Sequence, residues 1–168
     1  MKKATFDVKM NTRVMYNFLM SHAYSGPSGF LSHIIGIVIL VLFFTTLGET
    51  DTTKSVIYGI FGVWFLIYLP VSLYSKAVKQ VKLNPVYKKP LTYTVDEQGI
   101  ATSQGEQEAM VTWDKLVKVR ETKLSLLIYT GKSYCFVLPK EAMGEQCATV
   151  KALIQEKIDP RKVKIHGI

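Results

Sequence analysis

The sequence predicts an α+β membrane protein: a two-helix transmembrane hairpin, followed by a small antiparallel β-sheet that a C-terminal helix covers. Three observations predict this class. Two long apolar runs lie at residues 30–48 and 55–74, and neither contains Asp, Glu, Lys or Arg. Short segments in which apolar and polar residues alternate begin at Leu91. Beyond Pro139, apolar residues recur every three or four positions, which is the period of an amphipathic helix.

Each apolar run is long enough to cross a bilayer. A hydrocarbon core of roughly 30 Å requires about 20 residues at about 1.5 Å rise per residue. A core helix of a soluble protein would carry a polar stripe, whereas residues 34–44 are apolar all round. We therefore predict transmembrane helices at about 30–48 and about 55–74 within a hairpin domain of residues 30–74.

The net charge of +8, from 21 Lys and Arg against 13 Asp and Glu, is concentrated beside the predicted spans. Basic segments stay on the cytoplasmic side of a membrane, and the short loop between the two runs is net acidic. The pattern predicts a multi-pass protein of the plasma membrane with both termini in the cytoplasm. It does not favour nucleic acid as a partner.

Five lysines directly after the second run form the single candidate binding site, a contact with anionic lipid headgroups. Each lysine near an anionic leaflet contributes roughly 1 kcal/mol of attraction. The same residues also suffice to fix the topology, so both interpretations stay open. They are termed the juxtamembrane lysines: Lys76, Lys79, Lys82, Lys88 and Lys89.

Residues 1–29 predict a cytoplasmic arm that contains a strand and an amphipathic helix. Apolar and polar residues alternate from Ala4 to Met10, which is the period of a half-buried strand. Asn11 is a favourable N-cap for a helix that ends near Ala23, before a stretch rich in Gly, Pro and Ser. The strand has no partner nearby, so we expect it to join the sheet of the C-terminal half. About thirty residues precede the first run, so we expect a retained signal anchor rather than a cleaved signal peptide.

Several residues inside the apolar runs have structural interpretations. Ser55 and Gly59 form a small-xxx-small pair that permits close approach of helices, and Pro70 is expected to kink the second helix. His33 is expected to hydrogen-bond at headgroup level, because no second ionisable residue lies at membrane depth to receive a proton. The sequence assigns no role to Trp64, which falls in the middle of its span.

Residues 75–90 predict a basic juxtamembrane stalk, in which the second helix continues to Leu83 and Asn84-Pro85 ends it. Residues 91–160 predict a cytoplasmic β-domain. Its short turns favour a meander of about six antiparallel strands, and one long helix that stops at Pro160 is expected to cover the apolar face. Residues 161–168 form a basic tail that either returns to the membrane surface or frays.

Sequence motifs for catalysis, cofactor binding or metal binding do not occur. The chain contains no Walker, Gly-x-Gly-x-x-Gly or Gly-x-Ser-x-Gly motif that would present backbone amides to a phosphate or an oxyanion. The three histidines lack metal-ligand spacing: His22, His33 and His166. We therefore expect no enzyme activity, no cofactor and no metal.

Polar residues of the predicted β-domain have ordinary interpretations. Trp113 is expected to anchor the core. The alternating Lys118 and Arg120 predict a basic outer face that contacts either lipid headgroups or water, of which water is the favoured neighbour. Cys135 and Cys147 lie in the part predicted to be cytoplasmic and are expected to be free, buried thiols. Four carboxylates on turns and strand edges are expected to be solvated: Glu106, Glu108, Asp114 and Glu121.

Three segments and the paired apolar runs carry a resemblance to a known family. The segments read LTYTVDEQGI at 91–100, VTWDKLVKV at 111–119 and FVLPK at 136–140. The chain resembles the YcxB-like family of bacterial two-span membrane proteins over nearly its whole length. The resemblance implies a pleckstrin-homology-like cytoplasmic domain, and it implies no catalytic residue.

The predicted function is non-catalytic: the chain presents its cytoplasmic domain to a protein partner or to anionic lipid at the inner leaflet. The alternative is an immunity or stress-protection protein that acts through its membrane spans against a toxin or pore. Assembly into a homo-oligomer is compatible with both. Exchange of the hairpin for an unrelated two-span anchor separates them, since only the first function should survive the exchange.

Overall fold

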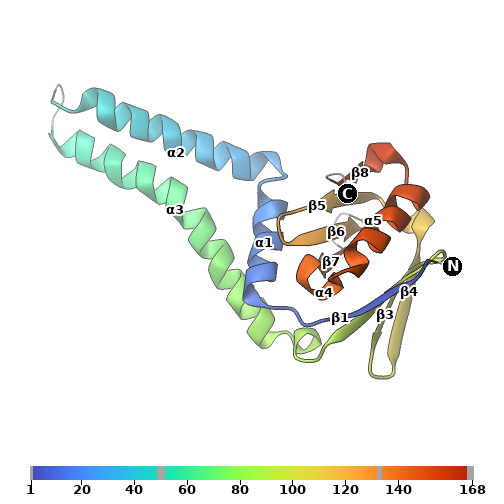
Figure 1. Cartoon of the computed structure of the whole chain (residues 1–168). Coiled ribbons are helices and arrows are strands. Elements are labelled where there is room, and N and C mark those ends of the chain that lie inside the picture. Colours follow the sequence, from blue (N-terminus) through green and yellow to red (C-terminus); the bar gives the residue numbers. More distant parts are fainter. Residues whose placement is uncertain (1, 49–51, 132–133, 166–168) are drawn as a thin grey trace. The chain divides into compact units, whose positions relative to one another are not determined.

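The computed structural model describes residues 2–48, 52–131 and 134–165, with the backbone alone described for residues 27–29 (Figure 1). The chain divides into two compact units. Met1–Phe18 and Lys79–Ile168 form one unit, termed the β-domain, and Leu19–Val78 form the other, termed the hairpin unit. The structure confirms an α+β chain that combines mainly antiparallel sheets with one long apolar helix.

The two apolar runs are helical. They lie in α2 (Pro27–Thr46) and α3 (Thr52–Leu83), and the central loop residues 49–51 are outside the described part of the chain. Among the described helices, α3 is the one both long enough and apolar enough to span a membrane, and Phe30–Thr46 is a shorter apolar helix. Pro70 lies inside α3 and does not end it. As predicted, the helix continues to Leu83, and Asn84 then caps the short 3-10 helix η1 (Pro85–Tyr87).

The N-terminal arm forms the predicted strand and helix. β1 (Ala4–Val8) pairs antiparallel with β2 (Leu91–Val95), so the expectation that this strand joins the C-terminal sheet is confirmed. α1 (Thr12–Ala23) begins where Asn11 Oδ1 accepts a hydrogen bond of 2.8 Å from the Val14 amide. A side-chain oxygen at this position satisfies one of the amides that the first helical turn leaves unpaired.

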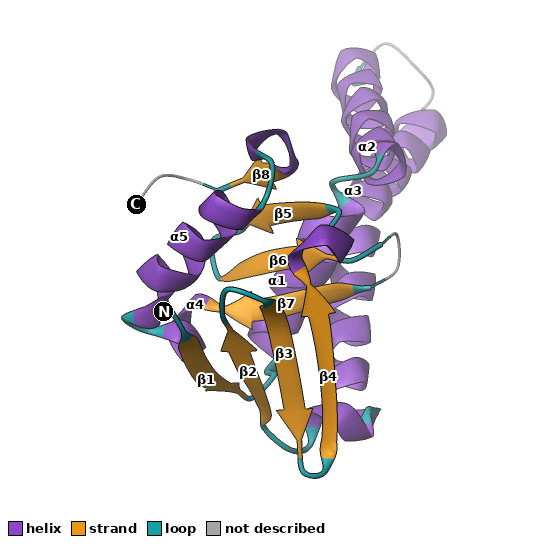
Figure 2. Cartoon of the chain, turned by 90° about the vertical axis from the view of Figure 1, so that its right-hand side faces the viewer, coloured by secondary structure: helices purple, strands orange, loops and turns teal. Residues whose placement is uncertain are grey.

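The β-domain contains two sheets of four strands instead of the predicted single meander (Figure 2). The first sheet has the order β1-β2-β3-β4, and the second has the order β7-β6-β5-β8. The chain passes between them at 113–115. A single meander would have a short hairpin turn here, whereas the structure has a 3-10 helix, η2 (Trp113–Lys115). The remaining strands are β3 (Gly99–Gln104), β4 (Gln107–Thr112), β5 (Lys118–Glu121), β6 (Ser125–Tyr129), β7 (Cys135–Pro139) and β8 (Val163–Lys164).

The C-terminal part differs from the prediction in two ways. The single long helix is divided into α4 (Lys140–Met143) and α5 (Gln146–Lys157), because Gly144 between them adopts a φ of +50° that few other residues tolerate. The basic tail is not free where it is described. After η3 (Pro160–Lys162), β8 pairs parallel with β5, while residues 166–168, and with them His166, lie outside the described residues.

The core of the β-domain joins both sheets to α4 and α5. Its fully buried members come from β2, β3, β5, β6, β7 and α5: Val95, Ile100, Val119, Leu126, Ile128, Leu138, Val150, Leu153 and Ile154. Trp113 packs against this core and donates a hydrogen bond of 3.0 Å from Nε1 to the Asp96 carbonyl, which confirms its expected role. On the other face of the second sheet, Val14 of α1 packs against Leu127 and Val137.

Candidate functional site

The hairpin unit exposes most of its apolar surface. Only 11% of the most apolar stretch of α3 is buried. Ile60 and Trp64 of α3 are 62% and 59% exposed, and Phe44 of α2 is 67% exposed. A continuous apolar surface of this kind marks a contact with a membrane or with another protein.

Small residues bring α2 and α3 close together within this unit. A Cβ atom added to Gly62 would lie 2.8 Å from the Leu40 side chain and 3.2 Å from the Leu40 backbone nitrogen. At Gly36, an added Cβ would lie 3.0 Å from Leu66. Close approach at glycine is the usual way in which membrane helices gain van der Waals contact.

The small-xxx-small pair belongs to the same helix contact. Ser55 is buried and donates a hydrogen bond of 3.4 Å to the Thr46 carbonyl, and Gly59 faces the ring of Phe43. The sequence interpretation of Ser55 and Gly59 is therefore confirmed as a contact between these two helices. It missed Gly36 and Gly62, although Gly62 follows Gly59 at helical spacing.

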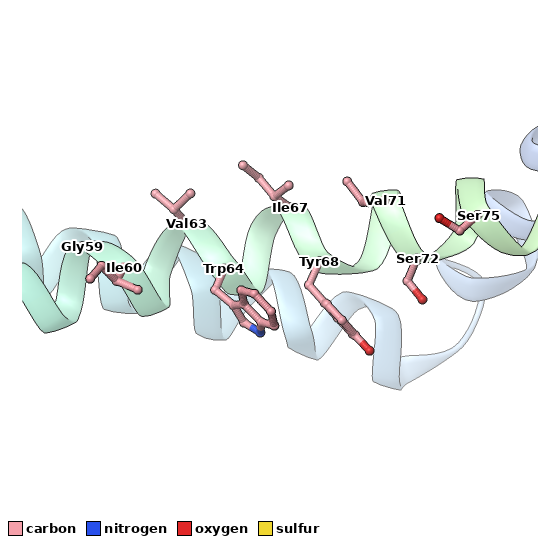
Figure 3. Close-up of a pocket in the computed structure, with 9 residues that line it drawn as sticks. All are labelled: Gly59, Ile60, Val63, Trp64, Ile67, Tyr68, Val71, Ser72 and Ser75. Atoms are coloured by element: carbon pink, nitrogen blue, oxygen red, sulfur yellow. The ribbon is translucent and has the colours of Figure 1, made fainter.

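A groove of about 830 Å³ runs along α3 (Figure 3). Trp64 and Tyr68 stack in it with ring centroids 5.4 Å apart and planes inclined by 19°. Trp64, to which the sequence assigned no role, thus forms an aromatic pair on the exposed helix surface. The lining is apolar apart from two serines near one end: Gly59, Ile60, Val63, Trp64, Ile67, Tyr68, Val71, Ser72 and Ser75.

All five juxtamembrane lysines are exposed. Lys76, Lys79 and Lys82 lie in the last part of α3, and Lys88 and Lys89 follow η1. Within the described part of the chain, none of the five forms an ion pair. One continuous helix therefore carries an exposed apolar segment followed directly by exposed cations.

His33 has a protein partner near the start of α2. The Tyr24 hydroxyl lies 3.0 Å from His33 Nε2, and the two rings meet edge to face with centroids 4.9 Å apart. This contact accounts for a polar side chain at the end of the apolar run without a proton relay.

Residues 95–154 match the model of the YcxB-like protein family. This part of the chain is similar to that family and is termed the YcxB-like region. The chain is also 25% identical over 113 residues to the uncharacterized protein YcxB of Bacillus subtilis (strain 168), an alignment that covers 66% of the chain and 61% of that protein. The chain thus spans less than two thirds of that relative. Both matches support the family resemblance that the sequence motifs indicated.

The YcxB-like region contains a buried carboxylate that the sequence interpretation placed in solvent. Glu106, Glu108 and Asp114 are exposed as expected, but the Glu121 side chain is only 3% exposed. Its Oε1 lies 2.5 Å from Lys140 Nζ and 3.0 Å from Lys151 Nζ. The period of β5 turns Glu121 to the same face as Val119, and α4 and α5 bring the two lysines to it.

Both cysteines of the YcxB-like region are free, as predicted, and each is half-buried. Burial raises the pKa of the Cys135 thiol to about 12, so this sulfur is protonated at neutral pH. Among the described residues, no three His, Cys, Asp or Glu side chains are grouped to hold a metal ion.

Proposed function

We propose that the chain is an integral membrane protein that performs no catalysis. Its α2–α3 hairpin crosses the plasma membrane twice and holds the β-domain, with a pleckstrin-homology-like fold, at the cytoplasmic surface. The continuity of α3 carries this proposal, because an exposed apolar helix passes without interruption into exposed lysines. Its 32 residues rise about 48 Å, enough for a hydrocarbon core of roughly 30 Å and the headgroup layer beyond it.

The pairing of β1 with β2 supports two crossings. The chain enters the hairpin from a domain that contains residues 4–8 and returns to the same domain at residues 91–95. A segment whose two flanks belong to one folded domain crosses a bilayer an even number of times. The 20 residues of α2 rise about 30 Å, which matches one crossing. The position of the juxtamembrane lysines favours the cytoplasmic side for the β-domain.

The juxtamembrane lysines are proposed to bind anionic headgroups at the inner leaflet. Their exposure and their lack of ion pairs within the described chain leave their charge available to lipid. The sequence left a protein partner for the β-domain open as the alternative to anionic lipid. The lipid experiment below separates these two binding partners.

Lipid co-purification from mixed detergent micelles tests this role. The full chain is expected to retain phosphatidylglycerol in preference to phosphatidylcholine. Replacement of Lys79, Lys82 and Lys88 by Gln should lower this preference at least about tenfold, since each lysine contributes roughly 1 kcal/mol. The matched control replaces Lys115 and Lys123, exposed lysines of β-domain turns, and should leave the preference unchanged. Equal retention of both lipids by the unaltered chain would contradict a lipid role.

A further inference from the structure

The second sheet of the β-domain has two chemically different faces. Lys118 of β5 lies opposite Tyr129, and Arg120 lies opposite Leu127, so both cations share the face on which α1 packs. β8 lies parallel to β5 with Lys164 opposite Arg120. Three cations therefore form a row on neighbouring strands. They are termed the sheet cations: Lys118, Arg120 and Lys164.

The strands contribute no carboxylate to this face. Strands β5 to β8 contain one carboxylate, Glu121, which lies on the opposite face with Lys140 and Lys151. The positions beside the sheet cations on β6 and β7 belong to uncharged residues: Leu127, Tyr129, Cys135 and Val137. Lys164 is exposed and Lys118 is half-buried, and neither forms an ion pair with a described residue.

α1 covers one half of this face and is also the element through which the chain leaves the β-domain. Val14 packs on Leu127 of β6 and Val137 of β7, and the strand order β7-β6-β5-β8 leaves the sheet cations beside it on β5 and β8. Beyond α1 the chain enters α2 at Pro27. The sheet cations and the first turn of α1 therefore share one face of the second sheet.

We propose that the sheet cations are a second contact with the phosphate groups of anionic lipids at the bilayer surface. This inference rests on the proposed function and gives it a site on the second sheet of the β-domain. Adjacent positions in the row are about 5 Å apart across the strands and about 7 Å apart along a strand. A flat row of that spacing suits a surface that presents many phosphate groups. Arg can donate two hydrogen bonds to one phosphate, and each Lys contributes a compact positive charge.

Lysine acetylation of the full chain in nanodiscs tests the proposal. Discs of phosphatidylcholine are compared with discs that contain about 30 mol% phosphatidylglycerol. Mass spectrometry gives the acetylation rate of each lysine. The rates at Lys118 and Lys164 should fall at least about threefold in the anionic discs. The rate at Lys123, exposed on the turn between β5 and β6, should not change. Equal rates at Lys118 and Lys164 in both discs would overturn the proposal.

A second comparison separates lipid from free phosphate. Soluble glycerophosphate, added to neutral discs, should leave the acetylation rates of Lys118 and Lys164 unchanged. If glycerophosphate alone slowed the acetylation of these two lysines, the assignment to the bilayer would be overturned. Protection of Lys76, Lys79 and Lys82 without protection of Lys118 and Lys164 would show that the sheet-cation proposal is wrong while the proposed function stands. Failure of the chain to enter either disc would show that both are wrong.

Variants give an independent readout that does not depend on the modified side chains. Amide hydrogen exchange at residues 163–165 should slow in anionic discs for the unaltered chain and for the matched control K123Q. It should not slow for the double variant K118Q/K164Q. Persistent slowing in the double variant would also contradict the proposal, because the charges that bind the phosphates would be absent.

Discussion

At the scale of single residues, a buried carboxylate joins a strand to two helices. Glu121 of β5 meets Lys140 of α4 and Lys151 of α5. Removal of a carboxylate from water costs several kcal/mol, which close ammonium groups offset only while both partners remain. The contact therefore fixes the position of α4 and α5 on the second sheet.

Glu121→Gln is predicted to destabilise the β-domain by about 3 kcal/mol, because the half-buried ammonium groups of Lys140 and Lys151 lose their buried counter-charge. Denaturant unfolding of the full chain in detergent, followed by circular dichroism, measures this loss. The matched control is Glu156→Gln, which removes an exposed carboxylate paired with Lys2 and should change stability very little. Equal effects of the two substitutions would contradict a structural role for the buried charge.

Cys135 is predicted to be inert to thiol reagents in the folded chain. Its raised pKa of about 12 leaves a thiolate fraction of about one in ten thousand at about pH 8. In a Cys147→Ser background, maleimide should modify Cys135 slowly until denaturant unfolds the β-domain. Because the folded pKa lies above the unfolded one, this group stabilises the fold below about pH 9 and loses that contribution as pH rises toward 12. Rapid modification of the folded chain would contradict the burial.

At the level of helices and strands, each unit has one contact that stabilises it. The hairpin unit has the contact between α2 and α3, and the β-domain has the pair β1–β2. The first depends on glycines at the helix contact, and the second depends on a strand that stands more than eighty residues before its partner, with Thr5 facing Thr94 across an interval of 89 residues. One substitution tests each contact, and a substitution of the neighbouring residue, which faces away from the contact, is its control.

Gly62→Ala is predicted to destabilise the hairpin unit. Helix propensity alone would favour alanine by about 1 kcal/mol. The added Cβ would instead lie 2.8 Å from Leu40, and such overpacking costs about 1 to 3 kcal/mol. Thermal unfolding in detergent should therefore shift to lower temperature for Gly62→Ala and much less for the exposed control Val63→Ala. A higher unfolding temperature for Gly62→Ala would show that the helices do not meet there.

Phe6→Ala is predicted to destabilise the β-domain by about 3 to 5 kcal/mol, because a large core side chain is lost. Phe6 is 7% exposed and stacks on Tyr93 with ring centroids 6.0 Å apart. Thr5→Ala, on the solvent face of the same strand, is the matched control. If denaturant unfolding gives the same midpoint for both variants, residues 4–8 are not part of the core.

Elements with a local periodic signal could be predicted from the sequence. β1, α1, the two apolar helices and the strands β2 to β7 all follow apolar spacing. As expected, Lys76, Lys79 and Lys82 lie in the last part of α3. Features that depend on distant contacts could not. β8 has two residues and is defined by its pairing with β5. The segment that connects the two sheets is stabilised by the hydrogen bond from Trp113 Nε1 to the Asp96 carbonyl. For the same reason, the sequence could not place Lys164 beside Arg120 or bring two lysines to Glu121.

At the scale of the whole molecule, a single folded domain contains the chain on both sides of the hairpin unit. An apolar helix pair that remains exposed in water would aggregate, whereas lipid covers it at no such cost. The proposed function therefore requires the β-domain on one side of a membrane and the α2–α3 loop on the other.

Cysteine accessibility in intact bacterial cells tests this arrangement across the membrane. In a background with Cys135 and Cys147 replaced by Ser, single cysteines are introduced as Thr52→Cys beside the loop, and as Lys3→Cys and Arg161→Cys in the β-domain; all three sites are exposed. A membrane-impermeant maleimide is expected to label the Thr52→Cys chain in intact cells and to label the other two chains only after permeabilisation. Labelling of Lys3→Cys or Arg161→Cys in unbroken cells would contradict this arrangement.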